Sequence, residues 1–82
     1  MHDNPTVEVS DTKINQAFVN WCELPFVKDA GDYLMFWTYI GDNHNSNMMP
    51  GPWLLTPQGA QRVDHLLGPY AATMVLAWKQ TQ

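Results

Sequence analysis

Positive charge is the scarcest property of this sequence. Its 82 residues include only four Lys and Arg, against eight Asp and Glu, and the formal net charge is −4. A protein that binds nucleic acid needs a Lys, an Arg or an aligned donor at each phosphate contact. Four cations cannot form such a surface, so we do not expect nucleic-acid binding. Eight acids are also too few for the dense anionic stripe of a DNA mimic.

Cysteine and metal-ligand spacing are scarce as well. The single cysteine, Cys22, excludes an internal disulfide and a thiolate metal site. His2, His44 and His65 are far apart in the chain and form no i, i+4 pair. No glycine-rich phosphate loop or carboxylate pair at catalytic spacing is found. Because Cys22 lies among apolar residues, we expect a small buried hydrophobe rather than a nucleophile. We therefore expect no enzyme activity, no metal and no cofactor.

Long apolar runs are missing too. No stretch approaches the roughly 20 residues that span a bilayer, and residues 1–5 lack the features of a signal peptide. We therefore expect a cytoplasmic protein without a membrane segment. Only 15% of the residues are charged, against about 25% in average proteins, whereas 45% are hydrophobic. Part of the apolar surface is thus expected to meet another protein or a second copy of the chain.

The most apolar stretch is 33–40, which holds four of the ten aromatic residues. A Gly-Asp pair precedes it and Gly41 follows it. Eight residues rich in aromatic and β-branched side chains are typical of a strand. In an extended chain Tyr33, Trp37 and Tyr39 face the same side. This pattern predicts the central strand of a small antiparallel sheet.

Two helices are predicted from the apolar spacing and from end signals. The first spans 12–24, where apolar residues recur at i, i+3, i+4, i+7 and i+8 from Ile14, and Pro25 ends it. The second spans 57–67. Thr56 is its predicted N-cap, a proline takes its first position, and a Gly-Pro pair follows its end.

The remaining segments have weaker signals. Residues 1–9 are predicted as a flexible arm or at best an edge strand, and 53–55 as a short strand that pairs with 33–40. Residues 41–52 are predicted as a long loop, because they are rich in Asn, Gly and Pro. Residues 70–79 favour a helix, although a buried strand is the alternative.

Together these elements predict one α+β domain over residues 10–82. Its N-terminal helix packs on a small antiparallel sheet centred on 33–40, and one or two C-terminal helices follow.

Ten aromatic residues are many for a domain of this size. Trp and Tyr are enriched at interface hot spots, and Met adapts to varied partners. For each aromatic residue taken singly, burial in the core is the favoured interpretation, but a domain this small is not expected to bury all ten. The residues predicted to form a protein interface are Tyr33, Trp37, Tyr39, Met48, Met49 and Trp53. Seven of the eight acids lie within residues 1–42, which favours a basic-surfaced partner.

Residues 53–59, continuing to Leu67, resemble the wing-strand-to-helix junction of some bacterial winged-helix regulators. In those proteins an aromatic-x-Leu-Thr-Pro-x-Gly stretch opens a C-terminal helix that often mediates dimerisation. This sequence departs from the pattern, because it has no basic recognition helix and no Lys or Arg in the loop before Trp53. The resemblance implies a winged-helix-like remnant used for protein contacts.

The sequence thus predicts a non-catalytic protein-binding module. We expect a small modulator or inhibitor of a larger macromolecule, or a homo-oligomeric interaction protein. Short acidic chains without motifs are common among phage and mobile-element accessory proteins, and this is the class we expect. The alternative is a winged-helix-like transcriptional regulator.

Overall fold

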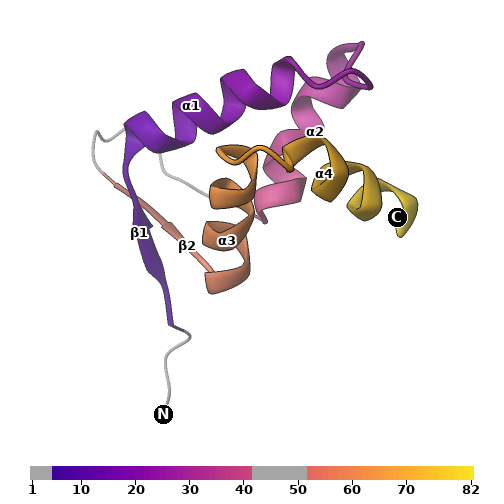
Figure 1. Ribbon diagram of the computed structural model, residues 1–82. Helices are drawn as coiled ribbons and strands as arrows, with labels where there is room; N and C mark the ends of the chain where they lie inside the picture. The colour runs from indigo at the N-terminus through magenta and orange to yellow at the C-terminus, as the bar shows by residue number, and fades with distance from the viewer. Residues whose placement is uncertain (1–4, 42–51) are drawn as a thin grey trace.

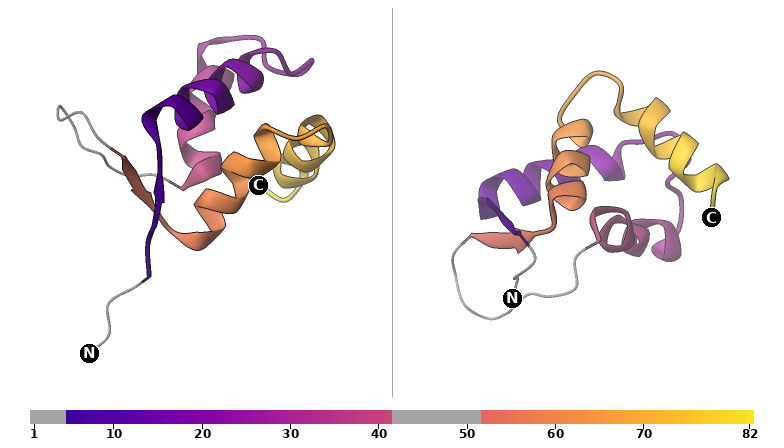
Figure 2. Two further views of the ribbon diagram at one scale, coloured as in Figure 1. Left: turned by 60° about the vertical axis from the view of Figure 1, so that its left-hand side comes forward. Right: turned by 90° about the horizontal axis from the view of Figure 1, so that it is seen from below.

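The computed structural model describes residues 5–41 and 52–82, which form four helices and one two-stranded antiparallel sheet (Figure 1). In chain order the elements are β1 (Val7–Val9), α1 (Asp11–Cys22), α2 (Ala30–Ile40), β2 (Trp53–Leu55), α3 (Pro57–Leu66) and α4 (Ala71–Gln80). The sheet lies at one end of the molecule and α4 at the other (Figure 1 and Figure 2). The predicted α+β class is confirmed.

The helices α1 and α3 agree with the two helices predicted from apolar spacing. Each begins with a side-chain cap, because the Ser10 hydroxyl accepts from the Lys13 N–H and the Thr56 hydroxyl accepts from the Gly59 N–H, both at 3.1 Å. The residues that they bury recur at helical spacing, as an amphipathic helix requires. These buried residues are Ile14, Ala17 and Trp21 in α1 and Gly59, Val63 and Leu66 in α3.

Residues 33–40 are helical, so the predicted central strand is wrong. They belong to α2, whose first turn is capped by the Asp29 side chain, which accepts from the Asp32 N–H at 3.0 Å. Gly41 ends the helix with a left-handed φ of 71°. The stretch is apolar on all sides, and hydrophobic period alone does not separate such a helix from a buried strand.

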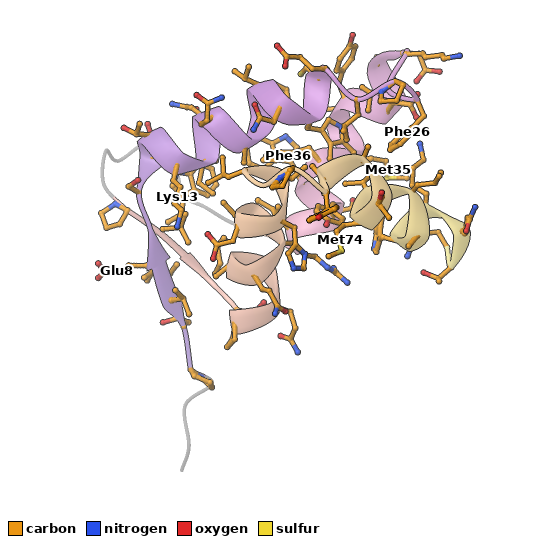
Figure 3. The ribbon with its side chains drawn as sticks, in the orientation of Figure 1. Glu8, Lys13, Phe26, Met35, Phe36 and Met74 are labelled. Atoms are coloured by element: carbon orange, nitrogen blue, oxygen red, sulfur yellow. The ribbon has the colours of Figure 1, made fainter. Side chains whose placement is uncertain are left out.

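Because 33–40 is helical, the hairpin predicted between it and 53–55 does not form. The short strand β2 is confirmed, but it pairs antiparallel with β1. The register places Val7 opposite Leu55, Glu8 opposite Leu54 and Val9 opposite Trp53. Val9 is only 4% exposed, so β1 contributes to the core, whereas Glu8 points away from the helices (Figure 3).

Residues 71–80 form α4, which settles the open choice for the C-terminal segment in favour of a helix. Every described element contributes to a single core. Its members are Val9, Ile14, Ala17, Trp21, Leu24, Val27, Phe36, Tyr39, Ile40, Leu55, Val63, Leu66, Ala71 and Val75. None of the helices in the described ranges is long and apolar enough to cross a membrane.

Candidate functional site

The predicted interface residues occupy different places in the fold. Tyr33 is 37% exposed, and Trp37 and Trp53 are half-buried. Tyr39 is only 1% exposed and belongs to the core. Met48 and Met49 lie outside the described residues. The structure therefore brings together one subset of the predicted residues, which is centred on Trp37.

Trp37 lies in the middle of a stack of three aromatic rings. The Phe18 ring of α1 lies 6.2 Å from the Trp37 ring at an interplanar angle of 18°. The centre of the Trp53 ring of β2 lies 5.5 Å from the centre of the Trp37 ring, and the interplanar angle is 17°. The Trp53 indole N–H donates to Asp11 Oδ1 at 2.9 Å, which fixes the outer ring of the stack. All three aromatic residues are half-buried, so the stack is part of the protein surface.

Two exposed side chains of α2 extend this stack. Tyr33 lies four residues before Trp37, and Leu34 lies three residues before it. Both are therefore neighbours of Trp37 on the helix surface. Leu34 is 65% exposed, one of the most exposed large apolar side chains in the described residues. We call the set Tyr33, Leu34, Trp37, Phe18 and Trp53 the α2 patch.

The opposite side of α2 faces the interior. Phe36 and Ile40 are fully buried, and Figure 3 labels Phe36 between the helices. The Tyr39 ring packs against Trp21 at 5.5 Å and Trp78 at 5.2 Å. Burial raises the pKa of the Tyr39 hydroxyl, and the nearby Arg62 partly offsets this effect. Tyr39 is therefore a structural residue and not part of the α2 patch.

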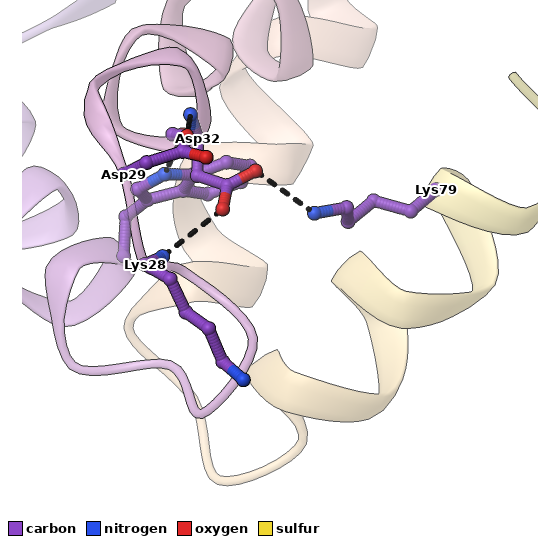
Figure 4. Close-up of polar contacts among 5 residues, drawn as sticks. Lys28, Asp29, Asp32 and Lys79 are labelled. Atoms are coloured by element: carbon purple, nitrogen blue, oxygen red, sulfur yellow. Dashed lines mark hydrogen bonds and ion pairs between the residues drawn. The ribbon is translucent and has the colours of Figure 1, made fainter.

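The first turn of α2 is fixed by a polar cluster around Asp32 (Figure 4). The Asp32 carboxylate accepts from the Lys28 N–H at 3.0 Å and lies 3.5 Å from the Lys79 ammonium of α4. Its backbone carbonyl accepts from the Trp21 indole N–H at 2.8 Å. The hydrogen bond from the Lys28 amide is the main reason that the pKa of Asp32 lies below its ordinary value. These contacts connect α2 to both α1 and α4, and so fix the position of the α2 patch.

Cys22 is the only thiol of the chain, and it lies at the end of α1. Cys22 is half-buried, and burial raises the pKa of its thiol, which lowers the thiolate fraction at neutral pH. No group of three or more His, Cys, Asp and Glu in the described ranges is arranged to hold a metal ion.

Phe18 and Leu34 belong to the α2 patch but were not among the predicted interface residues. A strand would place Leu34 on the opposite face from Trp37, whereas a helix places Leu34 beside Trp37. The signal that could have found it is the pair of helix ends, Asp29-x-x-Asp32 before the apolar run and Gly41 after it. No local sequence pattern predicts that Phe18 belongs to the α2 patch, because only the packing of α1 on α2 places its ring on Trp37.

Comparisons with protein-family models, with curated proteins and with solved structures give no match for this chain.

Proposed function

We propose that this chain is a non-catalytic protein-binding module whose binding surface is the α2 patch. It acts as a small modulator or inhibitor of a larger macromolecule or as a homo-oligomeric interaction protein. The observation that carries the proposal is the exposure of Leu34 (65%) and Tyr33 (37%) beside a half-buried aromatic stack.

The stacked rings suit binding because they are ordered before a partner arrives. Trp37 is held between Phe18 and Trp53, and Trp53 is held in turn by Asp11. Binding costs free energy when flexible side chains become immobile at an interface. Rings that are already fixed lose less entropy, and Trp and Tyr are the residues most often found at binding hot spots.

Charge favours a basic-surfaced partner. The Asp11 carboxylate accepts from the Trp53 indole N–H, so a negative charge borders the α2 patch. Two of the four cations pair with carboxylates within the chain. Lys13 pairs with Asp64, and Lys79 pairs with Asp32. A partner with Lys or Arg around an apolar centre would complement this distribution and be steered toward it.

Site-specific photo-crosslinking in the native host tests the proposal. A photoreactive amino acid is placed at Leu34 in one variant and at Leu76 of α4, which is 45% exposed, in a matched control. We expect a discrete adduct from position 34 and a much weaker one from position 76. An adduct of twice the chain mass would identify a second copy as the partner. Equal labelling at both positions, or none at position 34, would contradict the proposal.

A winged-helix-like regulator remains the second candidate, because one observation favours it. The two paired strands bracket α1 and α2, and β2 leads through Thr56 and Pro57 into α3, as the resemblance of this junction implies. However, α2 carries Asp32 and no Lys or Arg. Duplex DNA binding that falls steeply with salt would support this candidate, and no binding at low salt would remove it.

A further inference from the structure

A shallow groove of about 360 Å³ runs between α3 and α4, with Tyr39 of α2 among its lining residues. It lies on a different side of α2 from the α2 patch. Successive helical residues rotate by about 100°, so Tyr39 and Trp37 project roughly 200° apart. The groove is therefore a separate surface, and its role does not depend on the α2 patch.

The α3 wall of the groove is polar and carries a fixed cation. Arg62 donates from Nη1 to the Tyr39 carbonyl at 2.9 Å, and its guanidinium lies 5.3 Å from the centre of the Tyr39 ring. This hydrogen bond uses one of five guanidinium donors, and a guanidinium held in place is suited to two-point binding of a carboxylate. His65 lines the same wall.

The α4 wall is apolar. It presents Met74, Ala77 and Trp78, and Met74 is 40% exposed (Figure 3). Ala77 and Trp78 follow Met74 by three and four residues, so both lie beside it along one side of the helix. An occupant would bury apolar side chains against these three residues, the α4 stripe, while it faces Arg62 on the other wall.

Charge indicates which occupant fits. No Asp or Glu lines the groove, although the chain as a whole has a net charge of −4. We infer that the groove binds a short acidic segment of a partner protein, in which a carboxylate meets Arg62 and neighbouring apolar side chains meet the α4 stripe. The volume is near the lower end of ligand sites, about 300–1,000 Å³, which suits a few side chains of such a segment.

Selection from a library of random 12-residue peptides displayed on phage, against the intact protein, tests this inference. We expect the enriched peptides to carry Asp or Glu beside apolar residues. Arg62→Gln should weaken their binding about tenfold or more, because a hydrogen-bonded charge pair is lost. Lys13→Gln makes the same charge change on another face and should leave binding unchanged. No enrichment, or equal binding to both variants, would overturn the inference.

Arg62 also bonds to the Tyr39 carbonyl, so Arg62→Gln could weaken peptide binding by destabilising the fold. A second pair of variants separates these two effects. Ala77→Glu places bulk and negative charge in the groove but leaves the Arg62 contact intact, and it should abolish peptide binding. Leu76→Glu, about 100° away around α4, should not. If both variants bind alike, the groove is not the site. The wild-type protein could instead form oligomers that dissociate in the Ala77→Glu variant but not in the Leu76→Glu variant. A second copy of the chain would then occupy the groove, and this result would also overturn the inference.

Discussion

The helices α2 and α3 are similar in length and in how they begin, yet they use their side chains differently. They contain 11 and 10 residues, and each is capped by a side-chain oxygen that accepts from the N–H three residues on. In α3 the buried positions follow one face and polar residues cover much of the rest. In α2 Phe36 and Ile40 fill the core while Leu34 remains exposed.

This difference teaches where a binding surface can arise. A helix that is apolar on one face satisfies the core and leaves a solvated surface. A helix that is apolar on all sides buries one face, and the other needs a cover from outside or remains exposed. The surplus in α2 is therefore the physical basis of the proposed binding surface.

The largest expected effect separates the two faces of α2. Phe36→Ala should lower the free energy of unfolding by about 3–5 kcal/mol, because it empties a fully buried site. That loss is a large fraction of the stability of a domain of this size, roughly 4–12 kcal/mol. Leu34→Ala should change it by less than about 0.5 kcal/mol. Urea unfolding followed by circular dichroism measures both. Similar losses in the two variants would mean that Leu34 is a core residue.

The contact between α2 and α3 can be broken at a glycine. A Cβ at Gly59 would overlap the carbonyl oxygen of Ile40, so Gly59→Ala should push the helices apart and cost about 3 kcal/mol. Gly31→Ala is the control, because its nearest outside atom, Asp29 Oδ1, is 3.4 Å away. This control should gain up to about 1 kcal/mol from helix propensity. The difference in midpoint between the two denaturation curves measures the contact. Equal stability would show that α3 does not pack closely on α2.

The N-caps of α2 and α3 should contribute similarly to the free energy of unfolding, although the two helices differ in how they use their side chains. Asp29→Ala and Thr56→Ala each remove a hydrogen bond to an otherwise unpaired N–H, and each should lower the free energy of unfolding by about 1 kcal/mol. Thermal unfolding measures both variants. The restored caps Asp29→Ser and Thr56→Ser are the controls and should recover most of the loss. If Asp29→Ala left the free energy of unfolding unchanged, burial of apolar side chains alone would fix the start of α2.

The smallest effect is a pH dependence of stability that arises at Asp32, in the first turn of α2. The pKa of Asp32 is lowered in the folded protein, mainly by the Lys28 N–H and further by the Lys79 ammonium. The carboxylate therefore adds stability above its ordinary pKa of 3.8, and this stability is lost as the pH falls below 3.8 through the folded pKa. We expect Asp32→Asn to remove part of the acid-induced loss of stability that the wild type shows between about pH 5 and pH 2, measured by urea unfolding at each pH.

The matched control is Asp64→Asn, because Asp64 lies on an exposed face of α3 with its side chain 61% exposed. Exposed ion pairs contribute little to stability, so this variant should follow the wild-type curve. If the Asp32 variant also followed the wild type, the contacts around the first turn of α2 would not depend on its charge.

Sequence signals sufficed where local physics decides the structure. The spacing of apolar residues and the end signals at Ser10, Thr56 and Pro57 predicted α1 and α3. The stretch 33–40 failed because both of its faces are apolar, so its period is uninformative. The wrong strand prediction also misplaced one residue of the predicted interface. A strand puts Trp37 and Tyr39 on one face, whereas a helix separates them by about 200° and buries Tyr39.

The sequence by itself determined the composition of the molecule: an acidic chain with few cations, one thiol, two amphipathic helices and more apolar side chains than its core needs. Tertiary structure alone decided which of those side chains stay outside. It paired β1 with β2 across more than forty residues and brought Phe18, Trp37 and Trp53 into one stack. The reason is that periodicity records only neighbours along the chain, whereas contacts between distant segments depend on how whole elements pack.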